Sequence, residues 1–320
     1  MHALVVARHD RFAGLECSEV PDPRPEPGEI SIDVQVAGVG LIDALWTTGA
    51  MPSLPGFIPG LEVSGVVREL GEDVTGFTLG QRVVAILPAA GGFAEIVCAP
   101  AALVAAIPDG VDTDVAAVVP INTVTAHLAL TTVARFTPGE SLLVHAGVGG
   151  LGSQFAQVAK ALGAGRIDAV VGTAAKQETA AALGYDHAYL RNDLTAVPED
   201  TYDIVVDPVG GEATRTAFGL MRSGGRLLRV GNASQAPDVP VSSIDHWLQN
   251  KTTAGFNVGA WLAAHPEAGT DSLEWALTAV ARGDIRVDLT ETAEFPRVTD
   301  LLAALEQGRT TGKVAIRIRG

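Results

Sequence analysis

A cluster of glycines directly after an apolar run is the feature that most restricts the fold of this chain. Residues 142–145 are apolar up to the final histidine, as in a buried parallel strand, and apolar residues recur at helical spacing over residues 153–162. Between these segments, Gly147, Gly149 and Gly152 have G-x-G-x-x-G spacing. In that pattern the glycines allow a tight turn, a close approach of backbone to a pyrophosphate, and close packing of helix on strand.

Glycines at this spacing alone are equally compatible with an ordinary tight turn, but the flanking strand and helix favour a phosphate loop. The helix would direct its free N–H groups toward the phosphates. We therefore expect a dinucleotide-binding loop formed by Gly147, Val148, Gly149, Gly150, Leu151 and Gly152.

Two domains are expected, because 320 residues exceed the usual size of a single core. Up to about residue 120, short apolar runs alternate with Gly and Pro, which predicts a compact antiparallel or barrel-like domain. From about Thr113, helical and strand patterns alternate, which is typical of a parallel sheet covered by helices. The expected strands are 4–7, 29–36, 62–69, 82–86, 93–98, 103–107, 166–171, 203–206, 225–230, 290–295 and 314–318, and the expected helices 174–183, 212–221 and 261–282.

Charge and composition exclude several classes of partner. The formal net charge of −15 disfavours nucleic acid and anionic membranes, because the sequence has no basic patch that would release counterions. No apolar run reaches the ~18 residues that a membrane-spanning helix needs, and the N-terminus leads directly into a strand-like segment. We expect a cytoplasmic protein. Cys17 and Cys98 cannot form a disulfide framework or a cysteine-rich zinc site, and we expect both to be packed.

The chain resembles the zinc-independent members of the medium-chain dehydrogenase/reductase superfamily, in the quinone oxidoreductase branch. The resemblance is carried by residues 59–67, 80–83, 92–95, 107–111, 125–126, the glycine loop, 207–211, 224–227 and 312–314. It implies an α/β protein with a GroES-like β-rich catalytic domain over residues 1–120, completed by 259–320. It also implies a Rossmann domain with a doubly wound parallel sheet over residues 121–258, and an active site in the cleft.

The same resemblance makes absent residues informative. Zinc-dependent members carry a cysteine near Val39, a histidine at the position of Leu61, and a cysteine-rich lobe after Phe93, none of which is present here. We therefore expect no zinc. Glu62 matches an acid of the family, and two roles stay open for it: bonding to backbone in the cleft wall, or direct contact with the reaction.

The expected substrate pocket differs from that of the resembled family. Relatives have Asn at Gly40, Tyr near Leu45, Arg at Thr47 and Tyr at Met51, whereas Asp43 and Gly49 are kept. The resemblance thus implies a roomier, more apolar pocket, which suits a bulky apolar enone better than a small polar quinone. Its expected lining residues are Gly40, Leu45, Trp46, Met51, Leu61 and Glu62, although Trp46 fits a core position equally well.

The expected cofactor is NADPH rather than NADH. An acid at the end of the second strand would bind the ribose 2′-OH of NAD, but Asp168 lies in the middle of that strand, and Gly172 and Thr173 follow its end. Lys176 matches the lysine that relatives place on the 2′-phosphate, and Arg191 is a second candidate; the alternative for Lys176 is a solvated helix residue. The remaining expected cofactor contacts are Asn122, Thr125, Val230, Gly231, Asn232, Phe256 and Asn257.

The resulting expectation is an NADPH-dependent reductase of a quinone or of the activated C=C of a small apolar conjugated carbonyl. The alternatives are an enoyl reductase that tailors a polyketide-like or acyl intermediate, and a non-catalytic NADPH-binding sensor or structural protein. Thr125 would position the nicotinamide. Asp43 could donate the proton if an apolar pocket raised its pKa, but water is favoured as the donor, because an aspartate in a loop is more often a turn or hydrogen-bond anchor. The resemblance also implies a homodimer, since relatives pair through the edge strand of this sheet. The candidate segment here is 252–258, which would otherwise leave an exposed sheet edge.

Overall fold

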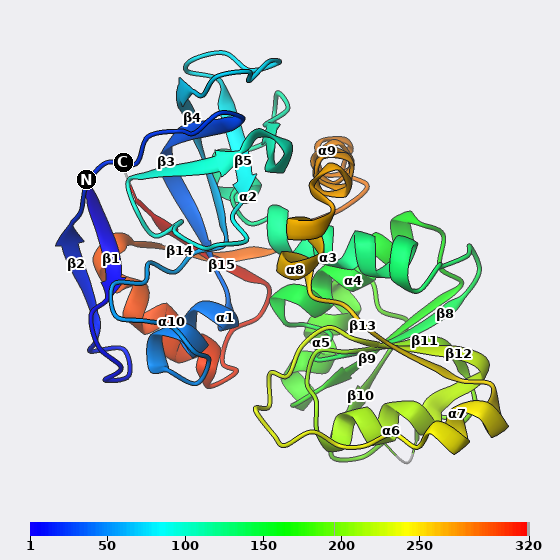
Figure 1. Ribbon diagram of the computed structural model, residues 1–320. Coiled ribbons are helices and arrows are strands. Elements are labelled where there is room, and N and C mark those ends of the chain that lie inside the picture. The colour runs from blue at the N-terminus through cyan, green and yellow to red at the C-terminus, as the bar shows by residue number, and fades with distance from the viewer. Residues whose placement is uncertain (195, 319–320) are drawn as a thin grey trace. The chain divides into compact units, whose positions relative to one another are not determined.

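The computed structural model describes residues 1–194 and 196–318, and it divides the chain into two compact units. Unit 1 contains Met1–Val124 and Val258–Gly320, and unit 2 contains Thr125–Asn257. The boundaries expected from the sequence are 120/121 and 258/259. The chain therefore begins in unit 1, passes through unit 2 and returns, so that the blue and red ends of the ribbon belong to the same unit (Figure 1).

Unit 1 is built on a mixed sheet with strand order β14-β15-β3-β4-β5-β7, in which β6 also pairs with β3. All its pairings are antiparallel except that of β14 with β15. A separate hairpin is formed by β1 and β2. The strands are β1 (His2–Val6), β2 (Leu15–Glu19), β3 (Glu29–Val39), β4 (Glu62–Leu70), β5 (Arg82–Ile86), β6 (Ile96–Pro100), β7 (Val104–Ala106), β14 (Leu289–Glu294) and β15 (Lys313–Arg317).

Strand β3 is the centre of unit 1, because it pairs with β4, β6 and β15. Its apolar residues Ile30, Ile32 and Val34 are fully buried in the main core. The helices of the unit are α1 (Leu41–Thr48), α2 (Thr113–Ala116), α8 (Val258–Ala264), α9 (Pro266–Arg282) and α10 (Val298–Glu306), while α3 (Pro120–Leu128) runs across the boundary with unit 2.

Several expected elements differ from those observed in unit 1. The predicted helix 261–282 is wrong as one element: it is α8 and α9, separated at His265, since Pro266 has no N–H to continue a helix and is instead tolerated in a first turn. The strand expected at 93–98 is shifted to β6, because Phe93 pairs with Leu4 and Pro59 instead. Helices α1 and α10 were not expected.

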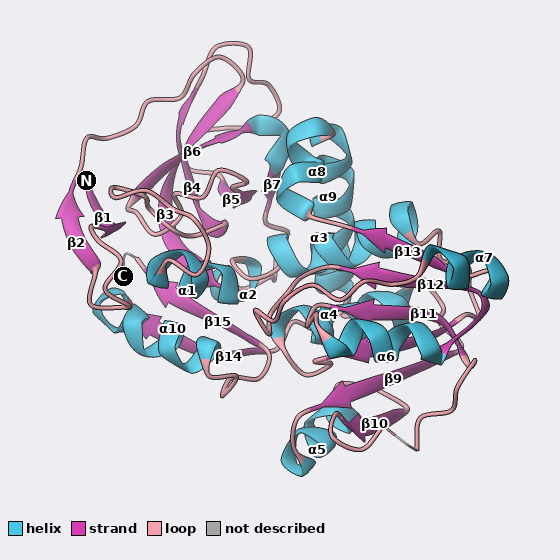
Figure 2. Ribbon diagram, turned by 60° about the horizontal axis from the view of Figure 1, so that its bottom comes forward, coloured by secondary structure: helices cyan, strands magenta, loops and turns pink. Residues whose placement is uncertain are grey.

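Unit 2 contains a six-stranded parallel sheet with the order β10-β9-β8-β11-β12-β13. Figure 2 shows the same order from its other end, as β13, β12, β11, β9 and β10; β8, which lies between β11 and β9, has no label in this view. The strands are β8 (Ser141–His145), β9 (Arg166–Val171), β10 (His187–Leu190), β11 (Tyr202–Asp207), β12 (Met221–Arg229) and β13 (Thr252–Gly255). The helices are α4 (Gly150–Ala161), α5 (Ala174–Ala182), α6 (Glu212–Leu220) and α7 (Ser243–Gln249).

This strand order confirms the predicted doubly wound sheet. From β8 the chain adds β9 and β10 on one side, then crosses to β11, β12 and β13 on the other. Right-handed crossovers in opposite directions place α4 and α5 on one face and α6 on the other, and α6 lies beside α7 in Figure 1. The point where the order reverses, beyond the carboxyl ends of β8 and β11, is where such sheets bind ligands.

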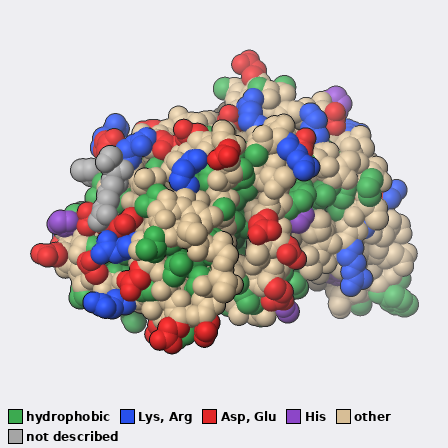
Figure 3. Space-filling view, turned by 90° about the horizontal axis from the view of Figure 1, so that it is seen from above, with side chains coloured by type: hydrophobic (Ala, Val, Ile, Leu, Met, Phe, Trp, Pro, Cys, Tyr) green, Lys and Arg blue, Asp and Glu red, His purple; other side chains and the backbone are tan. Residues whose placement is uncertain are grey.

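The surface and the cysteines complete the description. On the face drawn in Figure 3, basic and acidic side chains are interspersed and form no basic patch. No helix within residues 1–194 and 196–318 has the length and apolar character needed to cross a membrane. The expectation that both cysteines are packed is wrong for Cys17, which is exposed on β2, whereas Cys98 on β6 is partly buried.

Candidate cofactor and catalytic site

The glycine loop has the geometry that a phosphate loop requires. A Cβ at Gly147 would lie 2.7 Å from the Cβ of Ala169, and one at Gly152 would collide with the carbonyl oxygen of Ala146. Both positions are closed to any side chain, Gly147 by β9 and Tyr185, and Gly152 by the backbone of the loop itself. A Cβ at Gly149, the N-cap of α4, would meet only the Ala146 carbonyl oxygen, at 3.3 Å. The loop backbone is thus tightly enclosed at Gly147 and Gly152, and is less crowded at Gly149.

Two basic residues come together beyond the ends of β9 and β10. Lys176 lies in the first turn of α5, where its N–H donates to the side chain of the N-cap Thr173 at 3.4 Å. Arg191 follows β10, and its N–H donates to the carbonyl of Val171 at 2.9 Å. Its guanidinium carbon lies 3.8 Å from where a Cβ at Gly172 would stand. Burial, and then the charge of Arg191, lower the pKa of Lys176, which is consistent with two neighbouring like charges.

Asp168 is held inside unit 2 through one carboxylate oxygen, Oδ2, while its Oδ1 is buried without a hydrogen-bond partner among the described residues. Its carboxylate accepts a hydrogen bond from the Tyr202 hydroxyl at 2.5 Å and forms an ion pair with Arg166 at 2.7 Å. It lies within β9 and is fully buried. An acid in this position is part of the sheet and is not placed to bind a ribose.

The loops after β11 and β12 are locked together at the same edge of the sheet. Asp207, the last residue of β11, accepts from the N–H groups of Val209 and Gly210 at 2.8 and 2.9 Å. The N–H of Val230 donates to the Asp207 carbonyl at 3.1 Å. A Cβ at Gly210 would collide with the side chain of Asn232, and one at Gly231 would lie 3.0 Å from the Pro208 carbonyl oxygen.

Most expected cofactor contacts are therefore gathered at one edge of unit 2. The glycine loop, Gly172 to Lys176, Arg191, Val230 to Asn232, and the Phe256–Asn257 pair all follow the carboxyl ends of strands in a parallel sheet. Phe256 is buried, and its N–H donates to the carbonyl of Arg229 at 2.9 Å. The other two, Asn122 and Thr125, lie on α3, where Thr125 is buried and Asn122 is partly exposed.

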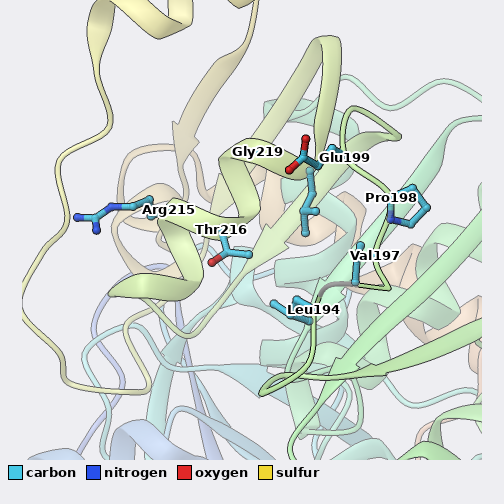
Figure 4. A pocket seen from close by; sticks show the side chains of 8 residues that line it. Leu194, Val197, Pro198, Glu199, Arg215, Thr216 and Gly219 are labelled. Atoms are coloured by element: carbon cyan, nitrogen blue, oxygen red, sulfur yellow. The ribbon is translucent and has the colours of Figure 1, made fainter.

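A surface hollow of about 490 Å³ in unit 2 lies elsewhere. It is lined by Leu194, Val197, Pro198, Glu199, Arg215, Thr216, Gly219 and Leu220, and Figure 4 shows Arg215 extending away from the other labelled side chains. These residues come from the segment before β11 and from α6, which leads into β12. The hollow therefore lies toward the amino ends of these strands, at the edge opposite to the glycine loop.

In unit 1, Asp43 is a buried acid whose two oxygens are both occupied by backbone. Its Oδ2 accepts from the N–H of Gly40 and its Oδ1 from the N–H of Gly60, each at 2.8 Å. The first contact closes the N-terminus of α1, and the second holds the loop before β4. Burial raises the pKa of Asp43 to about 7, although both backbone donors favour the charged form.

Glu62 is buried at the start of β4 and joins three segments of unit 1. Its Oε2 accepts from the N–H of Ile121, in the first turn of α3, at 2.7 Å, and its Oε1 forms an ion pair with the Nζ of Lys313 at 2.5 Å. A Cβ at Gly38 would lie 2.6 Å from the Cγ of Glu62, so only glycine at position 38 leaves room for this side chain. A carboxylate at the first turn of a helix is also favoured by the helix dipole.

Of the other expected pocket residues, Leu45 and Trp46 lie in α1, Gly40 and Met51 flank it, and Leu61 directly precedes β4. Leu45 is buried, and the N–H of Met51 donates to its carbonyl at 3.0 Å. Trp46 packs edge-to-face on Phe57, with ring centroids 5.1 Å apart. Gly40, Met51 and Leu61 are partly exposed.

Two residues of this network had no role assigned from the sequence. Lys313 belongs to the matched block 312–314, and Gly38 lies in the strand beside Glu62. The sequence shows Lys313 as a lysine at the start of an apolar strand, and this pattern does not indicate which residue forms an ion pair with it.

The arrangement of possible metal ligands across the described part of the chain bears on whether the protein could hold a metal ion. Within residues 1–194 and 196–318, no group of three or more His, Cys, Asp or Glu residues is arranged to hold a metal ion.

A β-rich GroES-like unit and a doubly wound nucleotide-binding unit define the class of medium-chain dehydrogenases/reductases. The family model described as "Alcohol dehydrogenase GroES-like domain" matches residues 26–109, and that described as "Zinc-binding dehydrogenase" matches residues 150–277.

Comparison with individual relatives indicates which branch of this class the chain resembles. A quinone oxidoreductase from Thermus thermophilus, also solved in complex with NADPH, is 30% identical, with a TM-score of 0.84 and coverage of 99% of this chain and 100% of that one. The human "Synaptic vesicle membrane protein VAT-1 homolog-like" is 29% identical over 96% of this chain and 76% of its own length. A phenolphthiocerol/phthiocerol polyketide synthase subunit of Mycobacterium tuberculosis is 29% identical over 98% of this chain. The chain spans 15% of the length of that synthase polypeptide.

The chain belongs to the medium-chain dehydrogenase/reductase superfamily, in its zinc-independent quinone oxidoreductase-like branch.

Proposed function

We propose that this protein is an NADPH-dependent, metal-independent reductase that delivers hydride to a quinone or to the activated C=C of an α,β-unsaturated carbonyl. The observation that carries the proposal is the edge of unit 2 where the glycine loop and the two cations, Lys176 and Arg191, follow the carboxyl ends of β8, β9 and β10. The similar quinone oxidoreductase solved with NADPH supports it.

The residues at this edge fit NADPH. The backbone at Gly149 is uncrowded enough for a pyrophosphate to approach, and the N-terminus of α4 would face its charge. Lys176 and Arg191 would hold the 2′-phosphate, since adjacent cations relieve their repulsion by binding an anion. Asp168 is occupied by Arg166 and Tyr202, so it would not repel that phosphate. When bound, the cofactor supplies a hydride from nicotinamide C4.

Unit 1 would supply the surroundings of the substrate. Leu45 and Met51 are apolar where the resembled relatives have tyrosine, and Trp46 and Leu61 would add apolar surface, which supports a conjugated carbonyl of apolar character. Asp43 and Glu62 have roles in holding backbone: Asp43 fixes the start of α1, and Glu62 fixes the start of α3, which carries Thr125. Thr125 would position the nicotinamide, and water would protonate the reduced substrate.

A second candidate is an enoyl reductase that acts on a polyketide-like or acyl intermediate. The similarity of nearly the whole chain to part of a polyketide synthase favours it. Its chemistry is the same, but its substrate would be an α,β-unsaturated acyl group carried as a thioester.

Consumption of NADPH with three substrate panels would test the proposal. Free enones, quinones and 2-enoyl thioesters should be offered to the same preparation, with NADPH binding measured in parallel. Turnover of free enones or quinones supports the leading function, and turnover confined to thioesters supports the second. Tight NADPH binding with no turnover in any panel would instead indicate a non-catalytic sensor or structural protein.

We also propose that two copies associate through β13. This strand is the outer edge of the parallel sheet, and Thr252, Thr253 and Gly255 on it are exposed. The adjacent helix α7 presents Ile244, Trp247 and Leu248, which are 60%, 76% and 63% exposed. An apolar helix beside a strand at the edge of a sheet suits pairing with a second copy. Light scattering should give twice the 33.0 kDa chain mass, and Trp247→Lys should shift it toward the monomer.

The proposed compartment is the cytoplasm, where an NADPH-dependent reductase would draw on the reduced cofactor pool. Fractionation of cells that express the native protein would test this, and recovery with a membrane or an extracellular fraction would contradict it.

A further inference from the structure

Tyr185 lies directly beneath the glycine loop, in the short segment between α5 and β10. Its hydroxyl lies 2.9 Å from the carbonyl oxygen of Gly147 and 2.8 Å from that of Gly152, and the whole residue is buried. A hydroxyl has one proton to donate, so it serves the two carbonyls by sharing or alternating that proton. Burial raises the pKa of Tyr185 far above its ordinary value, so the hydroxyl remains a neutral donor.

Tyr185 is itself fixed by the sheet. Its N–H donates to the Ala180 carbonyl at 3.2 Å, and the next residue, Asp186, bonds to Ile167 of β9 through both its backbone N–H and its side chain, each at 2.8 Å. The Tyr185 hydroxyl is therefore held in a fixed position beneath the glycine loop.

Gly147 and Tyr185 are matched to each other. A Cβ at Gly147 would lie 3.0 Å from the Tyr185 hydroxyl, in addition to its contact with Ala169. The glycine thus leaves the space that lets the hydroxyl reach the loop carbonyls.

The hydrogen bond also sets the direction of a peptide group. In a trans peptide the C=O and the following N–H point in opposite directions. When the Gly147 carbonyl is held down toward Tyr185, the N–H of Val148 is directed away from it. That is the orientation a backbone donor needs in order to meet a phosphate on the outer side of the loop.

We propose that Tyr185 is a positioning residue for dinucleotide binding, which orients the phosphate loop from beneath through the carbonyls of Gly147 and Gly152. The inference rests on the proposed binding of NADPH at this loop. It adds a residue that acts on the pyrophosphate common to NADPH and NADH, and that contacts neither cofactor.

The test compares Tyr185→Phe with wild type in fluorescence titrations with NADPH and NADH. Loss of one buried hydrogen bond should raise both dissociation constants by the same factor, about three- to tenfold. The kcat at saturating NADPH should be unchanged. Tyr189→Phe is the matched control, because the Tyr189 hydroxyl bonds Arg166 and not the loop, and its cofactor affinities should equal those of wild type.

Amide hydrogen exchange separates positioning from general destabilisation. In Tyr185→Phe, exchange should rise in residues 146–153 and stay at the wild-type rate in β8 and β11. If that variant cannot be purified, Tyr185→Leu, which also lacks the hydroxyl and leaves the glycine loop unchanged, takes its place, and both affinities should again fall by the same factor.

Unchanged affinities in a folded variant, or a loss confined to NADPH, would overturn the role of Tyr185. A wild-type protein that binds neither dinucleotide would instead overturn the proposed function.

Discussion

Lys313 and Glu62 form a buried ion pair, Nζ to Oε1 2.5 Å, between positions 251 residues apart in the chain. Their strands, β15 and β4, lie on either side of β3, and the pair meets where Gly38 has no side chain. The other oxygen of Glu62 caps the start of α3 at Ile121. One carboxylate therefore connects the sheet of unit 1 to the helix that carries Thr125.

Lys313→Met should destabilise the protein strongly, because it leaves the Glu62 carboxylate buried without a counter-ion. Breaking one side of such a pair typically costs about 3–5 kcal/mol. Urea unfolding would measure the free energy of unfolding. The control is the double variant Glu62→Gln with Lys313→Met, which removes the buried charge and should be more stable than Lys313→Met alone. A double variant as unstable as the single one would show that the charge is not the cause.

Lys176→Ala should weaken NADPH selectively. A charge-assisted hydrogen bond to the 2′-phosphate contributes about 1.5–3 kcal/mol, so the KM for NADPH should rise roughly ten- to a hundredfold while that for NADH changes little. Lys160→Ala is the matched control, since Lys160 lies in the last turn of α4, away from the carboxyl edge of the sheet. An equal rise in KM for both cofactors would show that Lys176 does not contact the 2′-phosphate.

Asp43→Asn should keep most of kcat. Both carboxylate oxygens accept backbone N–H groups, from Gly40 and Gly60, which suits an anchor better than a proton donor. A general acid typically contributes 10²–10⁴-fold. Steady-state kinetics on the folded variant would decide: a hundredfold drop in kcat with unchanged NADPH affinity would make Asp43 the acid and remove water from that role.

The stability of the folded protein should fall as the pH rises, because of Asp43. The pKa of Asp43 is raised from 3.8 to about 7 in the folded protein, so the folded state holds this proton more tightly than the unfolded one. Its stabilising contribution is complete below the unfolded pKa and is lost as the pH rises through the folded pKa. The stability of wild type relative to Asp43→Asn should therefore decline from about pH 4 to about pH 7 and then level off. Urea unfolding at several pH values would measure it, and a constant difference would contradict the raised pKa.

Activity should not depend on a metal ion. Leu61 occupies the position of a family zinc ligand, and hydride transfer to a conjugated carbonyl proceeds without a Lewis acid if the oxygen is hydrogen-bonded or protonated. Elemental analysis should find no stoichiometric zinc, and dialysis against a chelator should leave kcat unchanged. Stoichiometric zinc whose removal abolishes turnover would refute this.

Local pattern was sufficient for much of the fold. The apolar run before Gly147 and the helical spacing after it predicted β8, the loop and α4, and the alternation of patterns predicted the parallel sheet, which is confirmed. Segments without a strong period were missed: α1 is only eight residues long, and it is fixed by the contacts of Asp43 with Gly40 and Gly60.

Side-chain partners were less accessible to sequence reasoning than elements were. The bond from Glu62 to Ile121 links residues 59 positions apart, and that from Tyr185 to Gly147 links residues 38 apart. The first pair depends on the register of β3 with its neighbouring strands, and the second on how the segment before β10 packs beneath the glycine loop. A local periodicity in the sequence encodes neither arrangement. The polar character of Glu62 and Lys313 was visible, but their partnership depends on the folded sheet.

The return of the chain to unit 1 has a consequence for folding during synthesis. Unit 2 is one continuous segment, so all six of its strands are present once Asn257 has left the ribosome. Unit 1 starts earlier but must wait for β14 and β15, because β15 completes the pairing of β3. Contacts this distant in sequence form slowly. The nascent chain is thus expected to hold a finished nucleotide-binding unit while β3 still has an open edge and Glu62 has no lysine to neutralise it.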